Sequence, residues 1–111
     1  MVYALATLSV VPALTAEAIT QAIDDLETEQ TRHHIYDDPD HKWNLLFPDP
    51  NGNHWEDVKA VIRLVLLYGT PIANSKDPNQ VTYFYNYAGY VVYVVGRWVD
   101  GIFRISTAYV T

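Results

Sequence analysis

Two tight-turn signals divide the last third of the chain into three strand-like segments. Residues 80–87 and 90–98 lie on either side of Ala88-Gly89. Asp100-Gly101 then precedes residues 102–110. An Asp-Gly pair favours a two-residue hairpin loop, because both central residues of such a loop adopt positive φ. Segments joined by hairpin loops pair as antiparallel neighbours, so this region is predicted to form an antiparallel sheet.

A helix is predicted directly before this sheet, over residues 54–68. Asn53 is a suitable N-cap, and Glu56 stands three residues further on, as a capping box requires. Gly69 is expected to end the helix. Apolar residues recur at helical spacing and form a stripe that consists of Val58, Val61, Ile62, Val65 and Leu66.

The N-terminal part is also predicted to be largely helical. Helical spacing of apolar residues runs from Leu14 to about Thr31, with Thr15 as N-cap. Residues 2–11 fit either a strand or a short buried helix. The expected class is therefore α+β, with N-terminal helices packed on one face of a C-terminal antiparallel sheet. We expect one domain over residues 1–111, divided into an N-terminal helical part (1–31) and a core (32–111).

Composition excludes several kinds of chemistry. The chain has no cysteine, so disulfides, thiolate metal sites and a cysteine nucleophile are excluded. The net charge is −6, but residues 1–31 hold five acids and no Lys or Arg, whereas residues 32–111 hold eight acids and seven bases. A basic site can therefore exist in the second part. The apolar run Val2–Leu14 is too short to span a membrane and contains Pro12, so no membrane partner is expected.

Residues 32–53 are predicted to form a long polar loop that carries three of the four histidines. Metal-independent RNA cleavage needs a base for the 2′-hydroxyl, an acid for the leaving oxygen and a cation for the phosphate. His34, His41 and Lys42 supply these types together. The alternative to a catalytic role is that these are ordinary loop histidines in contact with solvent. A metal site formed by His33, His34, His41 and nearby aspartates is another alternative, although no recognised ligand spacing occurs. No cofactor is expected.

The last strand adds possible phosphate contacts. Strict alternation would place Arg104, Ser106 and Ala108 on one face. Arg104 and Ser106 would then share an open face, where they could hold a phosphate or simply meet solvent. The opposite face, expected to be the core, would consist of Phe103, Ile105, Thr107 and Tyr109.

Tyrosines alternate along the first hairpin strand, at Tyr83, Tyr85 and Tyr87. If this face is exposed, Tyr83 and Tyr85 are candidates for RNA binding, because exposed aromatic rings on a sheet stack on bases. The alternative is that tyrosine simply suits β-strands.

Four features occur in a characteristic order: His33-His34-Ile35, His41-Lys42-Trp43, a helix ending at Gly69, and Arg104–Val110 in the last strand. This order resembles the C-terminal nuclease domains of bacterial polymorphic toxins, of the barnase–EndoU–colicin–RelE group. The resemblance covers about residues 30–111. It implies a contact-dependent or Rhs-type effector, secreted as part of a larger protein and delivered to the target-cell cytoplasm.

Such toxin domains cleave RNA, often tRNA, and are neutralised by a cognate immunity protein. The resemblance assigns catalytic positions to His34, His41, Ser106 and Thr107, and its phosphate contacts are Lys42 and Arg104. Many nuclease toxins are basic, whereas this chain has a pI of about 4.9. A host protein that presents the RNA would account for the difference.

A competing hypothesis is a small acidic immunity or inhibitor protein that covers a basic toxin. The acidic segment 15–31 suits that role through charge complementarity. The histidine-rich loop would then have no chemical role. A structural subunit is the third hypothesis.

Overall fold

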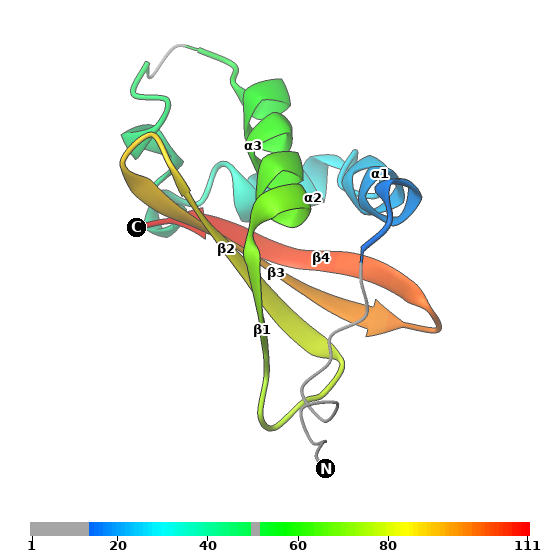
Figure 1. Ribbon diagram of the computed structural model, residues 1–111. Coiled ribbons are helices and arrows are strands. Elements are labelled where there is room, and N and C mark those ends of the chain that lie inside the picture. Colours follow the sequence, from blue (N-terminus) through cyan, green and yellow to red (C-terminus); the bar gives the residue numbers. More distant parts are fainter. Residues whose placement is uncertain (1–13, 50–51) are drawn as a thin grey trace.

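The computed structural model describes residues 14–49 and 52–111, and within these ranges all helices precede a four-stranded sheet (Figure 1). The elements are α1 (Ala16–Asp24), α2 (Glu29–Ile35), the 3₁₀ helices η2 (Pro39–His41) and η3 (Trp43–Leu45), α3 (Trp55–Tyr68), β1 (Thr70–Ala73), β2 (Gln80–Tyr87), β3 (Tyr90–Val99) and β4 (Ile102–Val110). The predicted α+β class is confirmed. The segment 2–11 lies outside the described residues.

The sheet is an antiparallel meander in the order β1-β2-β3-β4. The three predicted strands are confirmed, and β1 is an additional short edge strand that contains Pro71. Proline is tolerated there because an edge strand leaves some of its N–H groups unpaired. Both hairpin loops have positive φ at their central residues: 53° and 85° at Ala88-Gly89, and 52° and 80° at Asp100-Gly101. They are therefore primed turns, as the Asp-Gly signal predicts.

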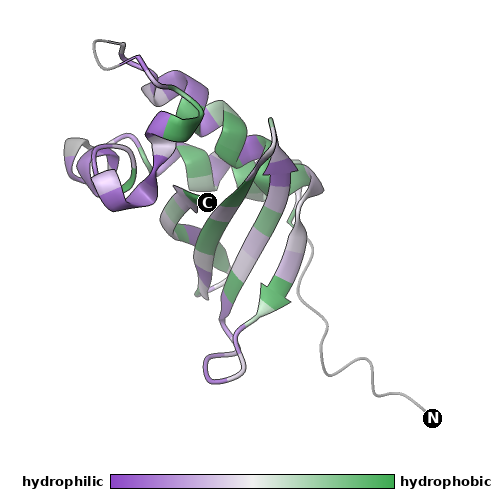
Figure 2. Ribbon diagram, turned by 90° about the vertical axis from the view of Figure 1, so that its left-hand side faces the viewer, coloured by the Kyte–Doolittle hydropathy of each residue, from purple (hydrophilic) through white to green (hydrophobic). Residues whose placement is uncertain are grey.

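One face of the sheet packs against the helices, as predicted, and we call it the inward face. Helix α3 contacts β2 and β3, and α1 contacts α3 and β4. Val58, Ile62 and Val65 of α3 are fully buried, as are Val92 and Val94 of β3. Each such side chain contributes about 1.5–3 kcal/mol relative to exposure. Figure 2 shows apolar bands along both the helices and the strands.

The N-terminal helical segment is two helices and not one, which corrects the predicted helix to Thr31. α1 ends at Asp24, and α2 begins after Thr28. The cause is a second cap: the Thr28 hydroxyl accepts the backbone N–H of Thr31 at 3.1 Å and starts a new helix. Thr15 caps α1 as predicted. Part of the predicted loop 32–53 is therefore the second half of α2.

Helix α3 begins without the predicted capping box. His54 is the N-cap residue, and its side chain makes no capping hydrogen bond. Asn53 still accepts the N–H of Trp55 at 3.3 Å. Glu56 instead pairs with Lys59 at 2.8 Å, and Lys59, which is buried, also pairs with Glu27. The Lys59–Glu27 pair connects α3 to the segment between α1 and α2.

A β-bulge at Ser106 changes which side chains of β4 face inward. Val95 pairs with Thr107, whereas the next residue, Gly96, pairs with Ile105. The extra residue reverses the alternation beyond it. The predicted faces of β4 are therefore wrong after Ile105. Ala108 faces inward and is fully buried, while Thr107 faces outward with Arg104.

Among the described residues, no helix combines the length and the apolar character needed to cross a membrane.

Candidate functional site

The structure brings His34 and His41 together, although α2 carries one and η2 the other. Their ring centroids are 6.0 Å apart in an edge-to-face arrangement. Asp38 caps η2, because its carboxylate accepts the N–H of Asp40 at 2.9 Å. This tight turn directs the chain back, so that His41 lies beside the end of α2.

His41 is held by both of its ring nitrogens, and its side chain is 16% exposed. Nδ1 lies 2.9 Å from the backbone oxygen of Ile35, which can only accept a hydrogen bond, so Nδ1 carries the donated proton. Nε2 lies 3.5 Å from both Thr107 Oγ1 and a carboxylate oxygen of Asp38. Nε2 is therefore the nitrogen that can exchange a proton with a bound group.

His34 is exposed, in contrast to His41. Its imidazole makes no hydrogen bond or ion pair with the part of the chain that the structure describes, and its ring contact is with His41. Both His34 nitrogens are thus available to a bound group. The pair consists of one positioned ring and one open ring, close enough to contact a single phosphate.

Trp43 fixes residues 38–43, which we call the histidine segment, to the sheet. Its side chain is 2% exposed, and Nε1 donates to the backbone oxygen of Ala108 at 3.2 Å. Because Ala108 belongs to β4, this bond ties the segment 38–43 to the edge of the sheet. The Thr107 hydroxyl consequently lies beside His41.

Tyr109 extends the site across the sheet. Its ring centroid is 6.2 Å from that of His41, and it stacks on Tyr93 at 5.0 Å. Strict alternation along the last strand predicts Tyr109 in the core, because the bulge has no signal in the sequence. The sequence feature that could have indicated Tyr109 is its place in the segment Arg104–Val110, two residues after Thr107.

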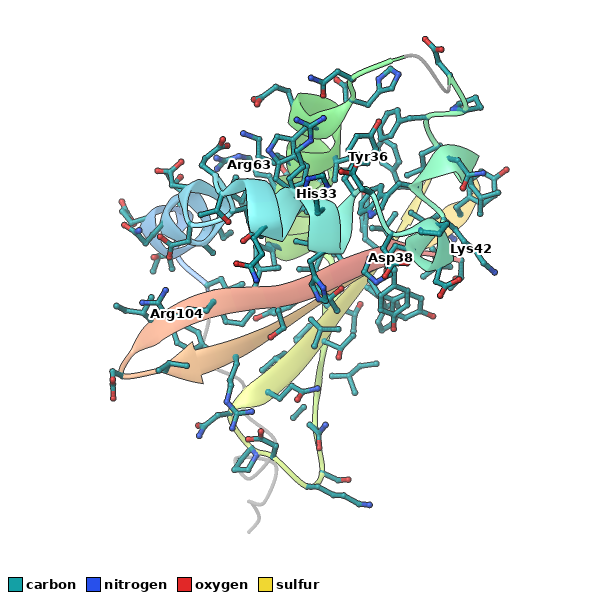
Figure 3. The ribbon with its side chains drawn as sticks, turned by 180° about the vertical axis from the view of Figure 1, so that it is seen from behind. His33, Tyr36, Asp38, Lys42, Arg63 and Arg104 are labelled. Carbon is teal, nitrogen blue, oxygen red and sulfur yellow. The ribbon has the colours of Figure 1, made fainter. Side chains whose placement is uncertain are left out.

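Arg104 and Ser106 do not join the histidine pair in the predicted way. Arg104 forms an ion pair with Asp25 at 3.6 Å. Figure 3 shows Arg104 at one end of β4, with Asp38 and Lys42 toward the other. Ser106 is exposed at the bulge, and Thr107, not Ser106, reaches His41.

Lys42 is exposed next to His41 and has a φ of 58°. A non-glycine residue in this left-handed region carries strain. Lys42 links η2 to η3, so the strained turn separates the histidine from the Trp43 anchor.

Tyr83 and Tyr85 lie on the inward face, which corrects their prediction as exposed RNA-binding residues. Tyr83 is 5% exposed and packs edge-on against Phe103 at 5.9 Å, and burial raises the pKa of its hydroxyl. Tyr85 is partly buried against the core and contacts Tyr68. Their cross-strand partners, Val94 and Val92, are fully buried, which shows why these positions face the helices.

A cleft of about 510 Å³ is lined by residues of the histidine segment and by Arg32, Tyr36 and Phe47. Three carboxylates, from Asp37, Asp38 and Asp49, also line it, so it disfavours a phosphate. Within residues 14–49 and 52–111, no group of three or more His, Asp or Glu side chains is arranged to hold a metal ion.

Comparison of the chain with protein-family models, with curated proteins and with solved structures gives no match.

Proposed function

We propose that this chain is a metal-independent endoribonuclease that acts as an antibacterial toxin domain. The observation that carries the proposal is the histidine pair: two rings lie 6.0 Å apart, and His41 has one nitrogen directed to a hydroxyl and a carboxylate. Two imidazoles in contact with one phosphate provide the base and the acid that RNA transesterification needs.

In the proposed reaction, one imidazole takes the proton of the ribose 2′-hydroxyl. The 2′-oxygen then bonds to phosphorus, the bond to the 5′-oxygen breaks, and the other imidazole protonates that oxygen. In this proposal Thr107, whose hydroxyl lies 3.5 Å from Nε2 of His41, donates to a phosphate oxygen, and Lys42, which follows His41 in the chain, adds positive charge. The products are a 2′,3′-cyclic phosphate and a free 5′-hydroxyl.

The biological setting comes from the resemblance to polymorphic-toxin nuclease domains. It points to tRNA as substrate, to delivery into the target-cell cytoplasm within a larger effector, and to a cognate immunity protein. Presentation of the RNA by a host protein is a further part of the proposal. His34, His41, Lys42 and Thr107 carry the roles that the resemblance assigns, and Ser106 keeps a peripheral place beside Thr107.

Cleavage of total RNA by the purified chain, with and without EDTA, tests this function. His41→Ala should slow cleavage by about 10²–10⁴, the contribution of one proton-transfer group. His33→Ala is the control, because His33 is an exposed histidine of α2 next to His34 in the chain, but it pairs with Asp37. Equal rates for wild type and folded His41→Ala would contradict the assignment, and loss of activity in EDTA would favour the metal-site alternative.

An acidic inhibitor is the second candidate, and α1 is the observation that favours it. Glu17, Asp24 and Asp25 are exposed on or next to this helix. Growth on expression separates the two candidates: a toxin domain should arrest cells unless its immunity protein is present, whereas an inhibitor should not.

A further inference from the structure

We propose that the outward face of the sheet binds single-stranded RNA along an aromatic row formed by Tyr109, Tyr93 and Phe84. The outward face is the one opposite α1 and α3. The proposal rests on the ribonuclease function above and specifies its substrate as an unpaired segment next to the cleaved bond.

The row follows directly from the strand register. Tyr109 of β4 lies opposite Tyr93 of β3, and Tyr93 lies opposite Phe84 of β2. The Tyr109 and Tyr93 rings are 5.0 Å apart with an interplanar angle of 17°, and Tyr93 and Phe84 are 6.3 Å apart. All three side chains are partly exposed. Three strands therefore contribute one continuous row of rings.

The row begins at the histidine pair. Tyr109 lies 6.2 Å from His41, which in turn lies 6.0 Å from His34. A strand whose phosphate meets the histidines therefore has neighbouring bases above Tyr109 and Tyr93. Aromatic rings hold such bases by stacking, which requires that the bases are not already stacked in a duplex.

The bulge at Ser106 is what creates this continuity. Without the extra residue, the alternation of β4 would turn Thr107 and Tyr109 inward. The bulge turns both outward, toward His41 and Tyr93. Bulges commonly re-aim side chains next to active sites.

The charge distribution also favours this face. None of the four described strands contains Asp or Glu, so the acidity of the chain lies elsewhere. Arg97 and Arg104 are opposite each other at the far end of the outward face. They pair with Asp77 and Asp25 respectively, yet their side chains remain 47% and 55% exposed. A phosphate backbone that crosses the four strands would meet neutral side chains along most of its path, and at the far end two arginines that are each paired with a carboxylate.

The test is binding of a 2′-O-methyl oligonucleotide, which cannot be cleaved because its 2′-oxygen is blocked. Wild type should bind it more tightly as a single strand than as a duplex. Tyr93→Ala should weaken binding by about 5- to 150-fold, the effect of losing one stacked base. Tyr93→Phe keeps the ring and should bind within about twofold of wild type. Tyr68→Ala is the matched control, because Tyr68 is 66% exposed but belongs to α3.

Wild-type affinity in folded Tyr93→Ala would overturn the proposed track, even if the chain cleaves RNA. Conversely, binding that depends on Tyr93 in a chain that never cleaves RNA would support the track and remove the nuclease function. A wild-type chain that binds no oligonucleotide but forms a dimer, with Tyr93→Ala monomeric, would assign the face to a second copy and overturn the proposal.

Discussion

The two faces of the sheet carry similar aromatic residues in different surroundings. On the inward face, Tyr83 is buried against Phe103 beneath the helices. On the outward face, Tyr93 and Tyr109 stack in a row that remains partly exposed and reaches His41. Tyrosine content therefore does not reveal function, because the strand register alone decides which rings stabilise the fold and which remain accessible.

The largest difference between the faces should appear in stability. Phe103→Ala should lower the free energy of unfolding by about 3–5 kcal/mol, because the ring is 1% exposed and packs closely over Gly96. Tyr93→Ala should cost only about 0.5–1.5 kcal/mol, the contribution of an aromatic pair. Urea denaturation of both variants measures the free energy of unfolding. Equal losses in the two variants would mean that Tyr93 is packed as tightly as Phe103 and that the outward face is not accessible.

Trp43→Phe tests the tie between the histidine segment and β4. Loss of the hydrogen bond to the Ala108 oxygen should lower the free energy of unfolding by about 1 kcal/mol and slow RNA cleavage, because His41 is held less firmly. Trp98→Phe is the control, since the Trp98 indole nitrogen is buried without a hydrogen-bond partner among the described residues. In Trp98→Phe the free energy of unfolding should not fall through the loss of a hydrogen bond, because the indole nitrogen makes none with the described residues. A cleavage rate in Trp43→Phe equal to wild type would show that the tie does not position His41.

A smaller change is expected at Lys42, where the histidine segment is strained. Lys42→Asn should raise the free energy of unfolding by up to about 1 kcal/mol, because asparagine accepts a left-handed conformation more readily. Cleavage should nevertheless slow, by less than in His41→Ala, since a charge near the phosphate is lost. Lys76→Asn removes the same charge from an exposed turn and serves as control. Unchanged cleavage in Lys42→Asn would remove Lys42 from the site.

The smallest effect concerns the buried hydroxyl of Tyr83 and appears only at high pH. Burial raises the pKa of Tyr83 above its ordinary value of 10.0. The resulting stability is fully present below pH 10 and is lost as the pH rises through the higher value in the folded state. The free energy of unfolding of wild type should therefore fall more steeply above pH 10 than that of Tyr83→Phe. Parallel curves for the two proteins would show that the Tyr83 hydroxyl is not buried.

The three hairpin strands β2, β3 and β4 and the helix α3 could be predicted because their signals are local, whereas the edge strand β1 was missed. Asp100-Gly101 specifies its turn within two residues, and the apolar stripe of α3 follows a single period. Which side chains of β4 face inward could not be predicted, because this depends on the bulge at Ser106. That bulge lies beside Gly96, whose missing side chain makes room for the Phe103 ring, and this contact joins different strands.

Only the part of the site that depends on local sequence could be predicted. His34 and His41 occur close together in the sequence, so the amino-acid sequence alone indicates a histidine pair. The contacts of His41 with Thr107 and Tyr109 depend on how the histidine segment meets β4, and this is set by the buried Trp43. Long-range packing of this kind leaves no local pattern.

The central claim is that His34 and His41 act on one phosphate, and a double-mutant comparison of cleavage rates tests it most directly. The experiment measures single-turnover cleavage by wild type, His34→Ala, His41→Ala and the double variant, each verified as folded. Residues that act as a unit are strongly non-additive. We predict that each single substitution slows cleavage by about 10²–10⁴ and that the double variant is hardly slower. A double variant slowed by the product of the two single effects would contradict joint action, and a His41→Ala rate equal to wild type would contradict the site itself.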